Sequence, residues 1–181
     1  MSEIKVNKIK SQQGSDAFTI ASDGAVTYEN SLAITGGNPA WRIGRATDES
    51  FTTSGSYLQG NWDNLDDAVE NIFMQNVTYS SGNITVPVAG IYQINATVRI
   101  DGLTTDSGYF IVSIRRNGVN TNNADTYLLN TRYSTNYTSF NVSDIFKADA
   151  DDSFSIYYYS SNDTSWHVNA NVSVFSGARI G

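Results

Sequence analysis

Three aspartates close together are the clearest candidates for metal chemistry in this sequence. Asp149, Asp151 and Asp152 bring three carboxylates into one short stretch, and carboxylate oxygens are ligands that calcium prefers. A calcium site needs about six oxygen ligands, and this spacing resembles no known calcium loop. The alternative, a solvated turn between two strands, is favoured by the spacing. We therefore predict no metal ion and no other cofactor.

The single histidine is the next group with catalytic potential. His167 follows Trp166, and serines and aspartates are abundant in the chain. A serine hydrolase needs all three residue types in one geometry, and any triad chosen here would be an arbitrary selection. The sequence also lacks a Gly-x-Ser-x-Gly motif, a phosphate loop and a histidine-rich metal spacing. We therefore predict that the chain is not an enzyme, and we assign no catalytic residue.

A third group of residues suits carbohydrate binding. Tyr133, Asp163 and Trp166 belong to loops rich in short polar side chains, which would share one end of an antiparallel body. An aromatic face beside amides and carboxylates is a reasonable surface for a sugar. The alternative is that these loops are ordinary and that Trp166 plugs the core, and the sequence favours this alternative.

The charge distribution argues against a nucleic-acid partner. The chain of 181 residues has a net charge of −7, and three of its four lysines, Lys5, Lys8 and Lys10, lie in the first ten residues. An acidic body repels phosphate backbones at long range, so only this small basic tip could approach one.

Several absences predict a soluble chain. No cysteine is present, so disulfides and thiolate metal sites are excluded. The opening "MSEIKVNKIK" lacks the apolar run of a signal peptide, and no stretch approaches the roughly 20 apolar residues of a membrane span. We expect a protein that is neither exported through a signal peptide nor inserted in a membrane.

Alternation of apolar and polar residues is the strongest structural signal. The apolar residues of one parity are Ile84, Val86, Val88, Tyr92, Ile94, Ala96, Val98 and Ile100. This period of two predicts half-buried strands. We expect strands near residues 41–46, 77–80, 83–88, 90–100, 109–116, 125–132, 137–146, 153–160 and 167–180.

The only candidate helix covers residues 64–73. Asn64 could cap it, and Leu65, Ala68, Val69 and Ile72 would share one face. An extended loop that leads into the next strand is an equally good interpretation.

Strands with one apolar face predict a fold with two layers. The further inward rows are Phe110, Val112 and Ile114; Phe140 and Val142; Phe154, Ile156 and Tyr158; and Val168, Ala170, Val172 and Val174. Two antiparallel sheets that face each other bury such strands economically. We predict an all-β protein, an antiparallel two-sheet jelly-roll sandwich.

The first 35 residues are predicted to form a separate attachment region, followed by the head domain at 36–181. Within the first region, "FTIASDGAVTYE" predicts a β-hairpin with Asp23 and Gly24 in its turn. A lone hairpin is only marginally stable in water, so it should pack on the head, on another copy or on a larger assembly.

Four motifs in order resemble the head of complement component one-q and the tumour-necrosis-factor-like jelly rolls. They comprise Val86, Pro87, Gly90 and Tyr92; Asn117 and Gly118; Ala150, Asp152 and Phe154; and Ser173, Phe175, Ser176 and Gly177. The resemblance covers about residues 40–181, although Asp151 replaces a glycine that is usual in the family. It implies a homotrimer around a threefold axis.

Adjacent tyrosines offer candidates for the trimer interface. Tyr157, Tyr158 and Tyr159 cannot all face one core, because neighbours in a strand point in opposite directions. Tyr157 and Tyr159 are therefore the interface candidates, because exposed aromatic patches often mark contacts. A ladder of tyrosines on a solvated surface is the alternative.

The N-terminal sequence is similar to openings of structural proteins of tailed bacteriophages. The two resemblances together imply a virion protein assembled in the host cytoplasm, either a short trimeric fibre or a decoration of capsid or tail. Its head would adhere to host-surface glycans. Ile4, Val6 and Ile9 would anchor it through strand pairing and apolar contacts, while Lys5 and Lys8 would match an acidic capsid or tail protein.

Two other functions remain open. The chain could be a free-standing bacterial carbohydrate-binding module, or a polysaccharide depolymerase carried on a fibre. The depolymerase has less support, because the sequence offers no carboxylate pair whose separation can be argued and no long β-helical shaft.

Overall fold

The chain divides into two compact units, Met1–Gly37 and Asn38–Gly181. The computed structural model describes residues 8–10, 16–20, 26–27, 38–65, 72–103, 109–129 and 137–181, with side chains described from residue 38 onward except over 120–129. All of the described elements are strands, so the all-β prediction is confirmed.

The N-terminal unit contains a small antiparallel sheet. Its strands are β1 (Lys8–Lys10), β2 (Asp16–Ile20) and β3 (Val26–Thr27). Ile20 pairs with Val26, so β2 and β3 form the predicted hairpin, while its turn lies outside the described residues. Of the predicted anchor, Lys8 and Ile9 belong to β1.

The other three anchor residues, Ile4, Lys5 and Val6, lie outside the described residues. The anchoring role of all five therefore stays a prediction.

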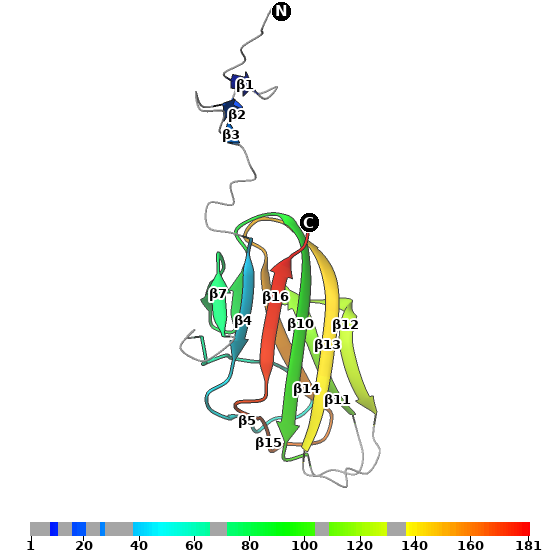
Figure 1. Ribbon diagram of the computed structural model, residues 1–181. Helices are drawn as coiled ribbons and strands as arrows, with labels where there is room; N and C mark the ends of the chain where they lie inside the picture. Colours follow the sequence, from blue (N-terminus) through cyan, green and yellow to red (C-terminus); the bar gives the residue numbers. More distant parts are fainter. Residues whose placement is uncertain are drawn as a thin grey trace, which may run out of the picture. The chain divides into compact units, whose positions relative to one another are not determined.

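The second unit, which we call the head, contains two antiparallel sheets. The first sheet consists of β4 (Ala40–Gly44), β5 (Glu49–Phe51), β7 (Phe73–Gln75), β10 (Gly90–Asp101), β13 (Tyr137–Ala148), β15 (Trp166–Val168) and β16 (Val174–Arg179). The second sheet consists of β6 (Tyr57–Gln59), β8 (Thr78–Ser80), β9 (Asn83–Thr85), β11 (Tyr109–Arg116), β12 (Val119–Leu129) and β14 (Ser153–Ser160). Figure 1 shows the strands of the first sheet in front of β11 and β14.

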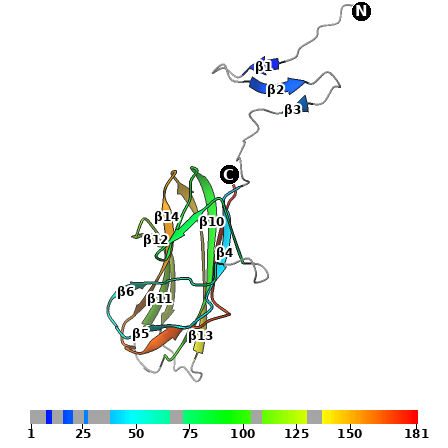
Figure 2. The same ribbon diagram turned by 90° about the vertical axis from the view of Figure 1, so that its left-hand side faces the viewer.

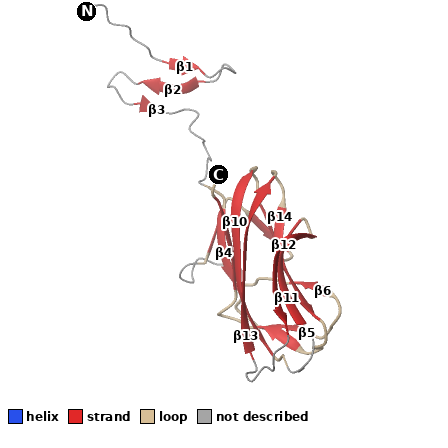
Figure 3. Ribbon diagram, turned by 90° about the vertical axis from the view of Figure 1, so that its right-hand side faces the viewer, coloured by secondary structure: helices blue, strands red, loops and turns tan. Residues whose placement is uncertain are grey.

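Strand β10 is the centre of the first sheet. It pairs with β13 along its whole length, and β16 and β15 pair with its other edge. In the second sheet, β14 lies between β11 on one side and β9 and β6 on the other. The head is the predicted jelly-roll sandwich, whose two layers are seen edge on in Figures 2 and 3.

The predicted alternation is confirmed in the core between the sheets. Tyr92, Ile94 and Val98 of β10 are fully buried, whereas Gln93 and Thr97 are exposed on the outer face. The second sheet contributes the predicted rows Phe110, Val112 and Ile114, and Phe154, Ile156 and Tyr158. This pattern follows from the pleat, which sends successive side chains to opposite faces of a sheet.

The prediction of a single strand over residues 167–180 is wrong. A turn over residues 169–173 separates β15 from β16, with Asn171 at φ 62° and the Val172 N–H donating to the Ala170 carbonyl at 2.8 Å. The turn resets the alternation. Phe175 is therefore buried, whereas Val172 is 44% exposed, contrary to the predicted inward row.

The candidate helix over residues 64–73 does not reach its predicted end, while most of its range is not described. Asn64 forms an isolated β-bridge with Gly44, and Phe73 begins strand β7. Residues 66–71 lie outside the described residues. Strands β5, β6 and β7 were not predicted, because three residues are too few to show a period of two.

Two turns at one end of the sandwich use backbone conformations that side chains rarely adopt. Asn117 and Gly118 have φ values of 52° and 72° and join β11 to β12, which confirms the predicted tight turn. Asp151 has φ 68°, a left-handed conformation that favours glycine.

Candidate functional site

The predicted sugar-binding tryptophan lies inside the core. Trp166 is 1% exposed, and its ring stacks on Phe51 with 4.2 Å between centroids. Phe110 and Tyr158 meet it edge to face at 4.9 and 6.0 Å. Trp166 therefore fills the core, as the alternative interpretation of the sequence states, and offers no surface to a sugar.

The other two residues of the predicted sugar site do not restore it. Asp163 is only 8% exposed, and its backbone N–H donates to the Ser160 hydroxyl at 2.9 Å. Tyr133 lies outside the described residues. The described structure thus brings none of the three together on an accessible surface.

The aspartates of the predicted turn serve the fold. Asp152 accepts hydrogen bonds from the Asn117 side-chain amide at 2.6 Å and from the Asp149 N–H at 2.9 Å. The Arg116 guanidinium also lies 3.7 Å from its carboxylate. Asp152 therefore closes the turn between β13 and β14, and in the described part of the chain no group of three or more acidic or histidine side chains could hold a metal ion.

The histidine lies on β15, which pairs with β5 and β10 in the first sheet, and it is close to two carboxylates. His167 Nε2 is 3.6 Å from Asp48 and 3.7 Å from Asp101. Asp101 also accepts from Arg99 at 2.8 Å and from the Asn169 amide at 2.8 Å. No serine hydroxyl joins this group among the hydrogen bonds of the described residues, so it is a polar cluster that links strand ends.

A group of five side chains covers the outer face of the second sheet, and we call it the tyrosine–arginine cluster. Its members are Tyr57 of β6, Tyr109 and Arg115 of β11, and Tyr157 and Tyr159 of β14. It includes Tyr157 and Tyr159, which the sequence offered as candidates for the trimer interface, while the intervening Tyr158 is buried in the core.

The rings of the cluster pack on one another. Tyr109 stacks on Tyr159 with 5.4 Å between ring centroids and an interplanar angle of 17°, and Tyr57 lies 5.0 Å from Tyr159. A hydrogen bond with the Tyr109 hydroxyl raises the pKa of Tyr159. The Tyr157 hydroxyl donates to the Gln59 side chain at 3.2 Å. Tyr109 remains 40% exposed, so the stack has an accessible face.

Arg115 is held between two of these rings. Its guanidinium carbon lies 4.1 Å from the centroid of Tyr57 and 4.3 Å from that of Tyr157. Its Nε is buried, with no hydrogen-bond partner among the described residues. Within the same part of the chain, no carboxylate lies within ion-pair distance of this guanidinium. The two rings thus attract the cation without accepting its N–H groups.

Two buried serines lie opposite members of the tyrosine–arginine cluster. Ser113 and Ser155 lie on the outer face of the second sheet, where Tyr157 and Arg115 are their respective partners in register. Both serines are nevertheless completely buried, and their hydroxyls have no partner among the described residues. Other side chains on this face must therefore cover them.

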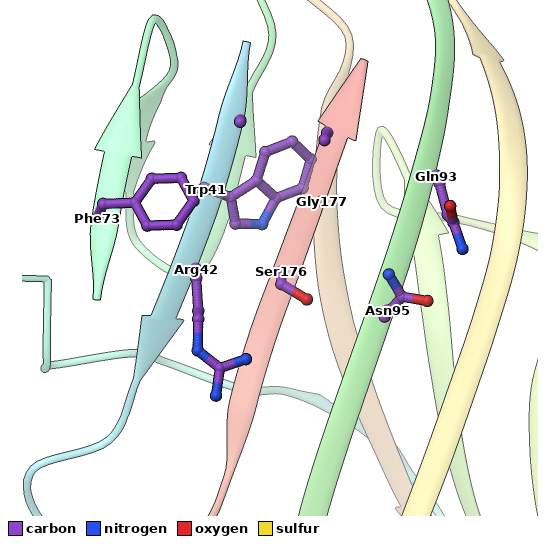
Figure 4. Close-up of a pocket in the computed structure, with 9 residues that line it drawn as sticks. Trp41, Arg42, Phe73, Gln93, Asn95, Ser176 and Gly177 are labelled. Atoms are coloured by element: carbon purple, nitrogen blue, oxygen red, sulfur yellow. The ribbon is translucent and has the colours of Figure 1, made fainter. Parts of the chain in front are cut away.

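The outer face of the first sheet carries a shallow hollow of about 250 Å³. Its floor consists of the small residues Ala40, Ser176 and Ala178, with Phe73 and Arg42 on one side and Gln93 and Asn95 on the other (Figure 4). The small floor residues create the depression, because the neighbouring strands carry longer side chains.

Exposed apolar side chains lie on both sides of this hollow. Phe73, on the edge strand β7, is 40% exposed. Ile145 of β13, the strand at the opposite edge, is 59% exposed and pairs in register with Gln93. The first sheet therefore presents apolar groups at two separate places on one face.

Comparisons with known proteins leave the site to be judged on its own geometry. No family model matches the chain, and no curated protein matches it either. Among the described residues, no helix has the length and apolar character needed to cross a membrane.

Proposed function

We propose that this chain is a structural protein of a phage virion, a short trimeric fibre or a decoration of the capsid or tail. In this proposal the head is an adhesive body that binds host-surface glycans, and the N-terminal unit attaches it to the particle. The chain binds and does not catalyse.

The division of the chain into two unequal units is the observation that carries this proposal. Asn38–Gly181 contains a complete sandwich with its own core, whereas the described residues of Met1–Gly37 form the three short strands β1, β2 and β3. So small a sheet gains little stability alone, and its edge strands are suited to pairing with another protein. This arrangement fits an attachment segment joined to a head that folds independently.

The outer face of the first sheet is suited to contact between copies of the head. An apolar residue such as Ile145 on one copy could enter the hollow beside Phe73 on the next. Such a contact uses two different patches, and a heterologous contact of this kind closes into a ring when the rotation allows it. A ring of three satisfies the symmetry implied by the resemblance to the tumour-necrosis-factor-like heads.

The oligomeric state tests this contact. Light scattering of the full chain should give the mass of a trimer, and Ile145→Asp should give monomers, because the new charge would lie in an apolar contact. Val119→Asp is the matched control, since Val119 is 65% exposed next to the β11–β12 turn of the second sheet. A monomeric wild-type chain would overturn the trimer, and dissociation only on changing Tyr157 or Tyr159 would move the interface to the tyrosine–arginine cluster.

Incorporation into particles tests the attachment role. A chain lacking residues 2–33 should remain folded by circular dichroism but should no longer sediment with particles assembled in its presence. A double change of Ile4 and Ile9 to Asp in the full chain provides a milder variant with the same expected result. Particles that still carry the shortened chain would show that attachment lies elsewhere, and a free carbohydrate-binding module would then be the better assignment.

A further inference from the structure

We infer that the tyrosine–arginine cluster is a binding site for a carboxylated sugar, with Arg115 receiving the carboxylate. This inference rests on the proposed adhesive function of the head and identifies the chemical class of its ligand. The cluster lies on the outer face of the second sheet, away from the face proposed for contact between copies.

Arg115 differs from three other arginines of the head in what its guanidinium contacts. Arg45, Arg99 and Arg116 each lie within 4 Å of a carboxylate: Glu49 at 3.0 Å, Asp101 at 2.8 Å and Asp152 at 3.7 Å. Arg115 is also partly buried, but the described side chains that flank its guanidinium are the aromatic rings of Tyr57 and Tyr157, and its Nε has no acceptor among the described residues.

Within the described part of the chain, no anion lies beside the Arg115 guanidinium. Removing N–H donors from water without giving them an acceptor costs free energy, which a bound anion recovers. A carboxylate matches the planar fork of a guanidinium with two parallel hydrogen bonds, which makes it a better partner than a spherical ion. The two tyrosine rings hold this fork in place before the ligand arrives, so little side-chain entropy is lost on binding.

The rings around Arg115 indicate that the anion is part of a sugar. Tyr109 and Tyr159 form a stacked pair beside it, with Tyr109 40% exposed. Aromatic rings offer an apolar face to the C–H groups of a pyranose, while their hydroxyls can bond to sugar hydroxyls. A sugar acid presents both a pyranose face and a carboxylate, so it satisfies the rings and Arg115 together.

The net charge of the chain limits the ligand further. With a net charge of −7, the protein repels dense polyanions such as nucleic acids at long range. A polysaccharide with one carboxylate per sugar has more widely spaced charges, and short-range pairing with Arg115 can outweigh this repulsion.

Calorimetry with trigalacturonate as the probe tests the inference on the full chain. Its methyl ester has the same rings without the charges, so it should bind at least about tenfold more weakly, the loss expected for a charge-assisted bidentate pair. Arg115→Gln should weaken binding of the free acid by a similar factor, and Arg115→Lys should not restore it, because an ammonium lacks the planar fork.

Arg116→Gln is the matched control for these variants. Arg116 is the next residue along β11, its guanidinium lies 3.7 Å from Asp152, and its replacement removes the same charge from the protein. This variant should bind trigalacturonate like the wild type. Circular dichroism and light scattering of every variant show whether fold and assembly are retained.

Asp125 allows a second independent test. The backbone register places it opposite Ser113, two residues from Arg115 along β11. Asp125→Asn should not weaken binding of trigalacturonate, because in this inference the Arg115 guanidinium is kept for the ligand. Weaker binding on this change would mean that Arg115 depends on an acidic partner within the protein, which would overturn the inference.

Three other results would also overturn it: equal binding of the acid and its ester, unchanged binding by Arg115→Gln, or displacement by inorganic sulfate at the concentration of the sugar. These failures would leave the proposed function standing as long as the chain still joins particles. A chain that binds trigalacturonate through Arg115 but joins no particle would instead retain the sugar site and refute the virion role.

Discussion

The indole ring of Trp41 packs directly over the backbone of Gly177. The two residues are paired between β4 and β16, and a Cβ added to Gly177 would lie 2.4 Å from two ring carbons of Trp41. Trp41 is 1% exposed and contacts Phe175 edge to face, so the ring has little room to move. Gly177 is thus needed for its lack of a side chain.

Gly177→Ala should lower the free energy of unfolding by about 1–3 kcal/mol, the usual cost of overpacking a core. Denaturant unfolding followed by tryptophan fluorescence measures this loss. Gly181→Ala is the control, because a Cβ there would meet only Ile91 at ordinary contact distances of 3.6 and 3.7 Å. Equal effects of the two changes would show that the Trp41 ring yields easily.

Two buried tyrosines provide a paired prediction about hydroxyl groups. The Tyr92 hydroxyl donates to the Val88 carbonyl at 2.7 Å, whereas the Tyr158 hydroxyl has no partner among the described residues. Burial also raises the pKa of Tyr158, so its hydroxyl stays neutral. Tyr158→Phe should therefore stabilise the protein by about 1 kcal/mol, while Tyr92→Phe should destabilise it by about the same amount.

Thermal and denaturant unfolding of both variants would measure these changes. Each variant is the control for the other, because each substitution removes one oxygen from a tyrosine that is 0% exposed. Loss of stability in Tyr158→Phe would mean that its hydroxyl has a partner, such as a buried water.

The sequence predicts the regular strands well and the irregular connections poorly. The alternation over residues 84–100 identifies β10 and its buried face, because the pleat imposes a period of two on a half-buried strand. The turn at Asn171 carries no such signal before the structure is known. A single residue in a left-handed conformation resets which side chains face inward, so the predicted inward row is buried at Val168 and Ala170 but exposed at Val172.

Only part of the tyrosine–arginine cluster could be predicted from the sequence. Tyr157 and Tyr159 stand two apart and so had to share the outer face, which identified part of the tyrosine–arginine cluster. Arg115 shares the parity of Tyr109, a signal that could have added both. Tyr57 could not be found, because it reaches the cluster only through the pairing of the three-residue strand β6 with β14.

Trp166 shows that the sequence of a loop does not predict whether one of its side chains is exposed. Its loop sequence is polar, yet its ring joins the aromatic core through Phe51 and Phe110. Trp166→Ala should lower the free energy of unfolding by about 3–5 kcal/mol, and Trp166→Phe should cost clearly less because it leaves a smaller cavity. Chemical denaturation checks both, and an alanine variant as stable as the wild type would mean that the ring is not part of the core.

Asp63 should contribute a measurable part of the acid sensitivity of the head. Desolvation opposes its ionisation, but hydrogen bonds from the Thr47 hydroxyl and the Ala46 N–H, together with the nearby Arg45 charge, lower its pKa below the ordinary 3.8. The unfolded chain then binds more protons than the folded one as the pH falls below about 4. The stabilisation from Asp63 is therefore complete above its unfolded pKa and is lost as the pH drops through its folded pKa.

Asp63→Asn should remove that pH-dependent contribution to stability. The difference in unfolding free energy between wild type and Asp63→Asn should be largest near neutral pH and should shrink between about pH 4 and pH 2. Asp144→Asn is a suitable control, because among the described residues its carboxylate accepts a hydrogen bond from the N–H of its own neighbour Ile145 alone, at 2.7 Å. A difference that does not change with pH would show that Asp63 has the same pKa in both states, and the acid loss would then have to come from other carboxylates.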